Sequence, residues 1–180
     1  MVSSAALERR LAALVERLAP RAIGFYWPLR GEFDARAWIV SWLGGQASQT
    51  SRQAALPGIP ERNAPLAFYA WTPDAPMREG HHGIPEPASQ ERVTPDLLLV
   101  PCVGFDAQGY RLGYGGGYYD RTLAAWPGAA QPVTVGIAWE ACRIDEGVPE
   151  REAHDLPLDA IVTDAATHLT SRFPSSPHTP

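Results

Sequence analysis

The hydrophobic positions of the first twenty residues repeat with the period of an α-helix. Leu7, Leu11, Leu14 and Leu18 lie three or four residues apart, and charged residues occupy many of the positions between them. Apolar side chains at this spacing line one face of a helix, so the pattern predicts an amphipathic helix. Pro20 is expected to stop it, because proline has no amide hydrogen and disfavours a continuing helix.

Short apolar runs along the rest of the chain predict β-strands. They occupy residues 22–27, 54–57, 66–71, 97–101, 132–138 and 158–163. A loop or hairpin is expected between the second and third runs, and a helix is expected over residues 35–43 with Asp34 as its N-cap. Helices that alternate with buried strands are typical of an α/β sandwich with a largely parallel sheet. Because ligands bind beyond the carboxyl ends of such strands, the loops after Trp27, after Pro101 and near Asp155 should converge in one cleft.

Two other segments differ in composition from these elements. Residues 72–95 are dense in proline, glycine and charge, and they read either as an ordinary surface excursion or as a segment that covers a substrate. From Ser171 onward the chain is rich in serine, proline and threonine, which predicts a disordered tail. The sequence therefore predicts one domain over residues 1–170 and a tail over residues 171–180.

Composition narrows the classes of partner. The 180 residues carry a formal net charge of −5, which argues against nucleic acid or an anionic membrane as the main partner. Cys102 and Cys142 show no metal or redox spacing and are predicted to be core thiols. His81, His82 and His154 lack further zinc ligands and are interpreted as loop residues. With no signal peptide and no apolar run long enough for a membrane span, a soluble cytoplasmic protein is expected.

A glycine-rich loop follows the apolar run at 97–101. Gly113, Gly115, Gly116 and Gly117 precede a predicted helix, and glycines reach positive φ without steric cost, so neighbouring amides can converge on an anion. The expected ligand is phosphate. The loop lacks the lysine of a Walker motif, its spacing differs from the dinucleotide fingerprint, and it precedes a helix where a kinase loop lies in a hairpin.

One family shows these residues in the same order. Residues 111–121, RLGYGGGYYDR, preceded by PCVGFD at 101–106, resemble the signature of the 5-formyltetrahydrofolate cyclo-ligase (methenyltetrahydrofolate synthetase) family. The resemblance implies a three-layer, Rossmann-like α/β sandwich with a parallel or mixed sheet, similar to that of sugar-phosphate isomerases and CoA-transferases. It also implies ATP-dependent conversion of 5-formyltetrahydrofolate (folinic acid), with or without a polyglutamate tail, to 5,10-methenyltetrahydrofolate. The products would include ADP and phosphate, the cofactor would be Mg²⁺, and a monomer is expected.

The resemblance also implies roles for individual residues. Catalytic roles are expected for Glu32, Arg111 and Tyr118, and Asp120 and Asp155 match two magnesium ligands of the family. The residues expected to bind ATP are Arg111, Leu112, Gly113, Tyr114, Gly115, Gly116, Gly117, Tyr118 and Tyr119. The residues expected to bind folate are Trp27, Glu32, Tyr114, Gly115, Gly116, Gly117 and Tyr118.

Structural readings compete with several of these roles. Arg111 would serve equally as a surface arginine that pairs with Asp106 or Asp120. Asp120 reads as a carboxylate in the first turn of a helix, Asp155 as a turn residue, and Trp27 as a core tryptophan. Glu32 would otherwise be an unremarkable charged residue of a loop. These alternatives remain open at the level of the sequence.

The resemblance departs from the family pattern at the beginning of the chain. Family members generally start with an additional basic helix whose lysine and arginine reach the ATP phosphates, and this sequence is expected to lack it. Arg9 and Arg10 fall on the helix that follows, so the role is not transferred to them. Two further hypotheses stay open: a folate- or nucleotide-binding homologue with little turnover, and a sugar-phosphate isomerase or CoA-transferase-like enzyme of similar architecture.

Overall fold

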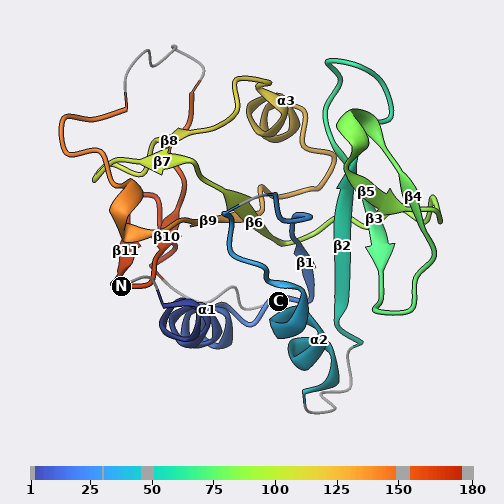
Figure 1. Cartoon of the computed structure of the whole chain (residues 1–180), viewed down its shortest axis with the longest axis horizontal. Helices are drawn as coiled ribbons and strands as arrows, with labels where there is room; N and C mark the ends of the chain where they lie inside the picture. Colours follow the sequence, from blue (N-terminus) through green and yellow to red (C-terminus); the bar gives the residue numbers. More distant parts are fainter. Residues whose placement is uncertain (1–2, 30, 46–50, 149–154, 176–180) are drawn as a thin grey trace.

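The computed structural model describes residues 3–29, 31–45, 51–148 and 155–175, which form a twisted sheet with helices on both of its faces (Figure 1). The helical elements are α1 (Ser4–Leu18), α2 (Arg36–Gly44), α3 (Tyr118–Ala124) and the 3₁₀ turns η1 (His81–Gly83) and η2 (Glu140–Cys142). The main sheet contains β1 (Ala22–Gly24), β2 (Gln53–Gly58), β3 (Ala67–Trp71), β6 (Leu97–Pro101), β9 (Val133–Ile137), β10 (Ala160–Val162) and β11 (Thr167–Leu169). Two small hairpins pair β4 (Met77–Glu79) with β5 (Pro85–Pro87), and β7 (Gly104–Phe105) with β8 (Arg111–Leu112).

The seven strands of the main sheet follow the order β11-β10-β9-β6-β1-β2-β3. The five inner strands run parallel, and the edge strands β3 and β11 are antiparallel to their neighbours. This arrangement confirms the predicted α/β class with a largely parallel sheet. The hairpin between β2 and β3 is also confirmed, whereas the short edge strand β11 was not predicted.

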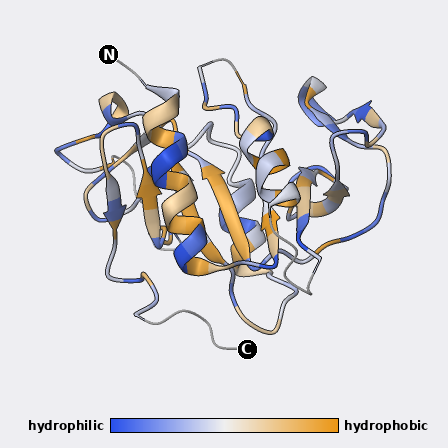
Figure 2. Ribbon diagram, turned by 90° about the horizontal axis from the view of Figure 1, so that it is seen from below, coloured by the Kyte–Doolittle hydropathy of each residue, from blue (hydrophilic) through white to orange (hydrophobic). Residues whose placement is uncertain are grey.

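Two hydrophobic clusters, one on each face of the sheet, form the core. Leu97 and Leu99 of β6 point into the cluster beneath α1 and α2, while Leu98 and Val100 point into the cluster beneath α3. Figure 2 shows these central strands in the hydrophobic colour between helices of mixed hydropathy. Because both faces of β6 are covered, its sequence is an unbroken apolar run with no alternation. Each fully buried leucine contributes about 1.5–3 kcal/mol to folding.

The connections of β1 and β6 leave the sheet in opposite directions. The chain passes from β1 through α2 to β2 on one side, and from β6 through α3 to β9 on the other (Figure 1). In an open α/β sheet such a reversal of strand order opens a crevice beyond the carboxyl ends of the two strands. The ends of β1 and β6 are therefore the place to look for a ligand site.

The first helix follows the prediction closely. Ser3 caps α1, since its Oγ accepts a hydrogen bond from the backbone N–H of Ala6 at 3.3 Å. The helix ends at Leu18, and Ala19 takes the left-handed conformation that closes many helices just before Pro20. In the described part of the chain, no helix has the length and apolarity needed to cross a membrane.

The start of the second helix differs from the prediction. Asp34 was expected to be the N-cap of a helix that begins at Ala35, but α2 begins at Arg36 with Ala35 in the cap position. The Asp34 carboxylate still accepts a hydrogen bond from the backbone N–H of Arg36 at 3.0 Å, and it also pairs with the Arg36 guanidinium at 2.6 Å. These contacts hold the pKa of Asp34 below its ordinary value. The carboxylate thus performs its capping role from one residue further back.

Residues 72–95 are more ordered than an unstructured loop. They contain the β4–β5 hairpin with η1 between its strands. Each strand has three residues, and Pro85 and Pro87 lie in β5. Strands this short show no hydrophobic period, which explains why the sequence did not predict them. The same reason applies to β7 and β8, which have two residues each.

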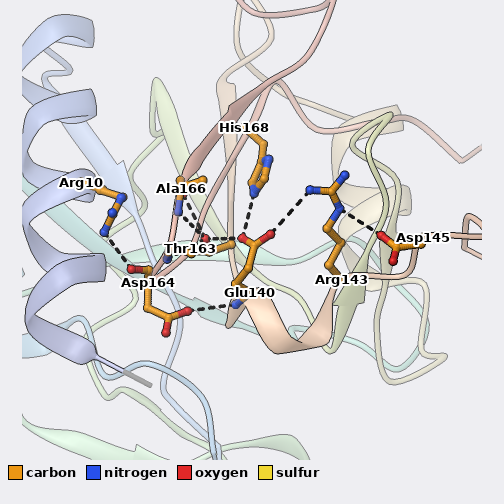
Figure 3. A network of polar contacts seen from close by, with 9 residues as sticks. Arg10, Glu140, Arg143, Asp145, Thr163, Asp164, Ala166 and His168 are labelled. Atoms are coloured by element: carbon orange, nitrogen blue, oxygen red, sulfur yellow. Dashed lines mark hydrogen bonds and ion pairs between the residues drawn. The ribbon is translucent and has the colours of Figure 1, made fainter. Parts of the chain in front are cut away.

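A network of polar contacts around Glu140 stabilises the C-terminal edge of the sheet (Figure 3). The Glu140 carboxylate accepts hydrogen bonds from Thr163 Oγ1 at 2.6 Å and contacts His168 Nε2 at 2.9 Å. Burial alone would raise the pKa of Glu140, but the contacts with Thr163 and His168 outweigh it and the pKa is lowered. The predicted disordered tail lies partly outside the described residues, at 176–180. Within the described part, Phe173 packs against the core.

Candidate functional site

A pocket of about 690 Å³ opens where the carboxyl ends of β1, β2 and β6 meet the glycine loop. Its lining includes Trp27 beyond β1, Pro57 and Gly58 at the end of β2, and Pro101 at the end of β6. Every residue that the sequence assigned to catalysis, ATP, folate or magnesium lines this one pocket. These residues are Trp27, Glu32, Arg111, Leu112, Gly113, Tyr114, Gly115, Gly116, Gly117, Tyr118, Tyr119, Asp120 and Asp155.

The backbone of the glycine loop explains its composition. Gly115 and Gly117 have φ values of +84° and +63°, in the left-handed region that side chains disfavour. Gly117 is also the residue from which α3 begins. A Cβ at Gly116 would come within 2.9 Å of the Tyr118 ring, so this position needs glycine for close packing. The loop therefore requires glycine for its shape, as the sequence predicted.

The path from β6 to the loop includes a hairpin that the sequence did not reveal. The strands β7 and β8 pair with each other in the segment between β6 and the loop. Arg111 and Leu112 lie in β8, ahead of the glycines. Asp106 organises the hairpin turn, since its Oδ1 accepts the backbone N–H groups of Gln108 and Tyr110 at 3.0 Å each. The hairpin sets where Arg111 enters the pocket.

Arg111 lies deep in the site with little exposed surface. Its guanidinium pairs with Asp120 Oδ2 at 3.3 Å and lies 5.3 Å from the centre of the Tyr119 ring. The open choice of partner is thus resolved in favour of Asp120, and the side chain is only 12% exposed, unlike a surface arginine. Burial raises the pKa of Tyr119 well above its ordinary value, so this ring is neutral. Arg111 supplies a positive charge to the lining of the pocket.

Glu32 is joined to the glycine loop across 82 positions of sequence. Its Oε1 accepts a hydrogen bond from the Tyr114 hydroxyl at 3.0 Å, and its Oε2 accepts the backbone N–H of Leu29 at 2.7 Å. Partial burial and the negative charge of Glu32 together raise the pKa of Tyr114, which keeps the hydroxyl a donor. A carboxylate acceptor and the loop that is predicted to bind an anion consequently face the same pocket.

Arg121 stabilises the glycine loop from outside the predicted set. Its Nη2 donates a hydrogen bond to the carbonyl oxygen of Gly116 at 2.7 Å, and its guanidinium lies 4.8 Å from the centre of the Tyr118 ring. The sequence pointed to no role for this residue, because an arginine in a helix is most often a solvated surface residue. These contacts link α3 to the conformation of the loop that precedes it.

The two predicted magnesium ligands come from separate segments. Asp120 lies in the first turn of α3 and Asp155 lies before β10, and both line the pocket. The described residues contain no group of three or more histidine, cysteine or acidic side chains suited to a metal. Magnesium in phosphate-transfer sites commonly uses one or two carboxylates together with phosphate oxygens and water, so two carboxylates that line one pocket are of the kind this ion uses.

Trp27 lies between the core and the pocket, so its predicted contact with the folate ring stays a prediction. It is partly buried against the core cluster and it also lines the pocket. The Arg36 guanidinium lies 4.3 Å from the centre of the Trp27 ring.

Tyr26, which precedes Trp27 in the chain, is buried, and its hydroxyl donates a hydrogen bond to the carbonyl oxygen of Phe33 at 2.9 Å. Burial raises the pKa of Tyr26 well above its ordinary value.

The prediction of a core thiol is confirmed for Cys102, whereas Cys142 lies outside both core clusters. Cys102 is buried, and Cys142 is half-buried; both are free thiols. Burial raises the pKa of Cys102 to about 12, so the thiol is not a nucleophile at neutral pH.

The sequence did not predict which residues form one side of the pocket. The 72–95 segment contributes His81, His82, Ile84 and Glu86 to the lining. The length of the segment had suggested a substrate-covering role without pointing to any residue.

His154, which was interpreted as a loop residue, lies outside the described residues. Arg10, on α1, donates to the carbonyl oxygen of Asp164 at 2.8 Å (Figure 3), consistent with a structural role.

Comparisons with known proteins agree with this geometry. A model of the 5-formyltetrahydrofolate cyclo-ligase family matches residues 1–164. The 5-formyltetrahydrofolate cyclo-ligase of Haemophilus influenzae is 36% identical over 152 residues, which cover 81% of this chain and 76% of that protein. The Escherichia coli K12 protein of the same name is 37% identical, over 74% of this chain and 72% of its own.

Solved structures share the fold. The NMR structure of Aquifex aeolicus 5,10-methenyltetrahydrofolate synthetase matches with a TM-score of 0.75 and 30% identity, covering 97% of this chain and 84% of that one. A 5,10-methenyltetrahydrofolate synthetase from Mycoplasma pneumoniae has a TM-score of 0.65 at 24% identity, over 89% of this chain and 84% of that one.

Proposed function

The chain belongs to the 5-formyltetrahydrofolate cyclo-ligase family, and from this premise we propose that it catalyses the ATP-dependent closure of 5-formyltetrahydrofolate to 5,10-methenyltetrahydrofolate. ADP and phosphate are the other products. The observation that carries the proposal is the hydrogen bond of 3.0 Å between Tyr114 and Glu32. It brings the predicted phosphate-binding loop and the predicted folate acceptor to one pocket.

The reaction needs an activated formyl oxygen. This oxygen attacks the γ-phosphorus of ATP, the bond to ADP breaks, and the formyl carbon becomes electrophilic. N10 of the folate then attacks that carbon, and inorganic phosphate leaves as the carbon–oxygen bond breaks and N10 loses its proton. Such chemistry depends on position and on charge stabilisation more than on a covalent enzyme intermediate.

The chain supplies positively charged and polar groups for the phosphates. The amides of the glycine loop, residues 113–117, bind phosphate oxygens, and the Arg111 guanidinium offsets charge that develops during transfer. Asp120 and Asp155 would hold Mg²⁺, which would neutralise charge on the phosphates of bound ATP. The Arg111 guanidinium lies 3.3 Å from the Asp120 carboxylate, so both groups would act at the same place in the pocket.

Glu32, Trp27 and Tyr118 serve the folate. Glu32 accepts a hydrogen bond from a folate N–H and orients N10 toward the formyl carbon. Its orientation is maintained by Leu29 and Tyr114, which occupy its two oxygens on the protein side. Trp27 and Tyr118 provide flat faces for the ring system. A monomer and a cytoplasmic location remain predictions from the sequence.

The test is direct conversion. The purified chain is mixed with 5-formyltetrahydrofolate and MgATP, and the near-ultraviolet absorbance of the methenyl product is followed. Asp120→Ala should abolish product formation and so exclude a contaminating enzyme. Asp145→Ala is the matched control, because Asp145 is 89% exposed and does not line the pocket.

Three outcomes separate the hypotheses. Product that requires ATP and appears with the Asp145→Ala control but not with Asp120→Ala supports the cyclo-ligase and excludes an ATP-independent isomerase. No product, with folate bound in a calorimeter, supports the binding homologue with little turnover. Neither product nor folate binding refutes the substrate assignment.

A further inference from the structure

Glu86 is a buried acidic residue in the wall of the pocket that the proposed reaction does not use. It lies in β5 of the 72–95 segment, it is only 6% exposed, and it lines the pocket. Burying a carboxylate costs free energy unless it is paired or hydrogen-bonded, so the contacts of Glu86 indicate its role.

All the contacts that the structure gives to this carboxylate are on one oxygen. Arg78 Nε and Nη2 donate to Oε1 at 2.9 and 2.7 Å. No residue in the described ranges donates a hydrogen bond to Oε2. Among the described residues, Arg121 Nε is the one fully buried side-chain polar atom without a partner, so Oε2 keeps some exposed surface. Because Glu86 lines the pocket, Oε2 is an acceptor available to a molecule there.

Two glycines make room for this oxygen. A Cβ at Gly58 would lie 2.8 Å from Oε2 and 2.6 Å from the Tyr69 ring, and a Cβ at Gly80 would lie 2.7 Å from Oε2. Any side chain at either position would collide with the carboxylate. The sequence thus places glycine at the end of β2 and just before η1, where the acceptor needs space.

Charge and neighbouring side chains limit the possible ligand. A phosphate is repelled by the carboxylate, and a cation gains little because Arg78 already balances the charge. A neutral N–H donor is therefore the best match. Ile59 follows Gly58 and Ile84 precedes β5, and both line the pocket, so apolar side chains flank the acceptor and suit a flat ring.

We propose that Glu86 Oε2 accepts a hydrogen bond from the exocyclic amino group of a bound heteroaromatic ring and so selects the substrate. The inference rests on the proposed function, whose two substrates both carry such a group: the pterin 2-amino group of the folate and the 6-amino group of adenine. The chemistry is the same in both cases, and the source is decided by experiment.

The first experiment uses the unmodified chain. The KM and the calorimetric Kd are measured for 5-formyltetrahydrofolate and for its analogue with methyl in place of the 2-amino group. ATP is compared in the same way with purine riboside triphosphate, which lacks the 6-amino group. Loss of a hydrogen bond to a charged acceptor should weaken one of these ligands by about 10- to 100-fold.

The second experiment changes the acceptor. In Glu86→Gln the carbonyl oxygen keeps the contact with Arg78, and the amide NH₂ faces the pocket, where it opposes another donor. This variant should weaken the same substrate by about 10- to 100-fold and should not discriminate against the analogue. Glu79→Gln, an exposed position on β4, is the matched control and should leave both KM values unchanged.

Each result decides the proposal. Weakening confined to the folate pair identifies the pterin, and weakening confined to the nucleotide pair identifies adenine. If the unmodified chain binds both analogues as tightly as the natural substrates, the proposal is overturned, whether or not Glu86→Gln folds. If the chain neither binds nor converts the natural substrates, the proposed function itself fails, and this inference with it.

Discussion

The positive φ values of the glycine loop lead to a quantitative prediction for two alanine variants. At Gly115, with φ +84°, an added Cβ meets nothing within 4 Å, so Gly115→Ala imposes backbone strain alone. Alanine pays about 1–2 kcal/mol in the left-handed region. If the loop must keep this conformation to bind phosphate, kcat/KM for ATP should fall by about 5- to 30-fold.

Gly117→Ala adds a steric term to the same strain. With φ at +63°, its Cβ would lie 2.9 Å from Arg121 Nη1, so the guanidinium has to move. The hydrogen bond from Arg121 to the carbonyl oxygen of Gly116, 2.7 Å long, would then be lost at a cost of about 0.5–1.5 kcal/mol. The sum, about 1.5–3.5 kcal/mol, corresponds to a fall in kcat/KM of roughly 10- to 400-fold.

The assay is steady-state methenyl formation at saturating folate with ATP varied, alongside the thermal unfolding midpoint of each variant. Gly44→Ala is the matched control, because Gly44 lies in α2 with open space around it and no positive φ. It should leave kcat/KM for ATP unchanged. An unchanged kcat/KM in Gly115→Ala, or an equal loss in Gly44→Ala, would show that the loop conformation does not control ATP binding.

Two further predictions concern the metal and the edge of the sheet. Asp120→Asn and Asp155→Asn should each raise the Mg²⁺ concentration needed for half-maximal turnover by about 10-fold or more, measured by titrating Mg²⁺ at saturating substrates; an unchanged requirement in both variants would argue against these ligands. Glu140→Gln should lower the free energy of unfolding by about 1 kcal/mol at pH 7, because it weakens the contacts with Thr163 and His168. Since the folded-state pKa of Glu140 is lowered, its contribution is present above the unfolded value of about 4.5 and is lost as the pH falls through the folded value. Urea unfolding at pH 7, 5, 4 and 3 should therefore show the difference from the unmodified chain shrinking in acid, and a difference that grows would contradict this assignment.

Local pattern was sufficient for the elements with a strong period or an unbroken apolar run. The α1 helix was predicted because four leucines repeat on one face, and β6 was predicted because its run is apolar on both faces. The weaker elements had no such signal. A strand of two or three residues, such as β7, β8 or β5, is stabilised by its partner and has too few side chains to show a period.

The sequence predicted the motif residues of the candidate site, but it did not predict every residue that lines the pocket. The motif residues from Arg111 to Asp120 are contiguous, so a resemblance in sequence could identify them together. Glu86 had no comparable signal, since an acid between two prolines is typical of a solvated loop. Its burial depends on Gly58 and on Arg78, which lie in other parts of the chain.

The sequence by itself determined the α/β class, most of the main-sheet strands and the glycine loop, because helix period, apolar runs and positive-φ glycines act over a few neighbouring residues. Only the tertiary structure decided which distant segments share the pocket. Tyr114 meets Glu32 across 82 positions because β1 and β6 are adjacent in the sheet and their connections diverge at the same edge. Strand order is set by the packing of whole elements against one another, which no local pattern of residues encodes.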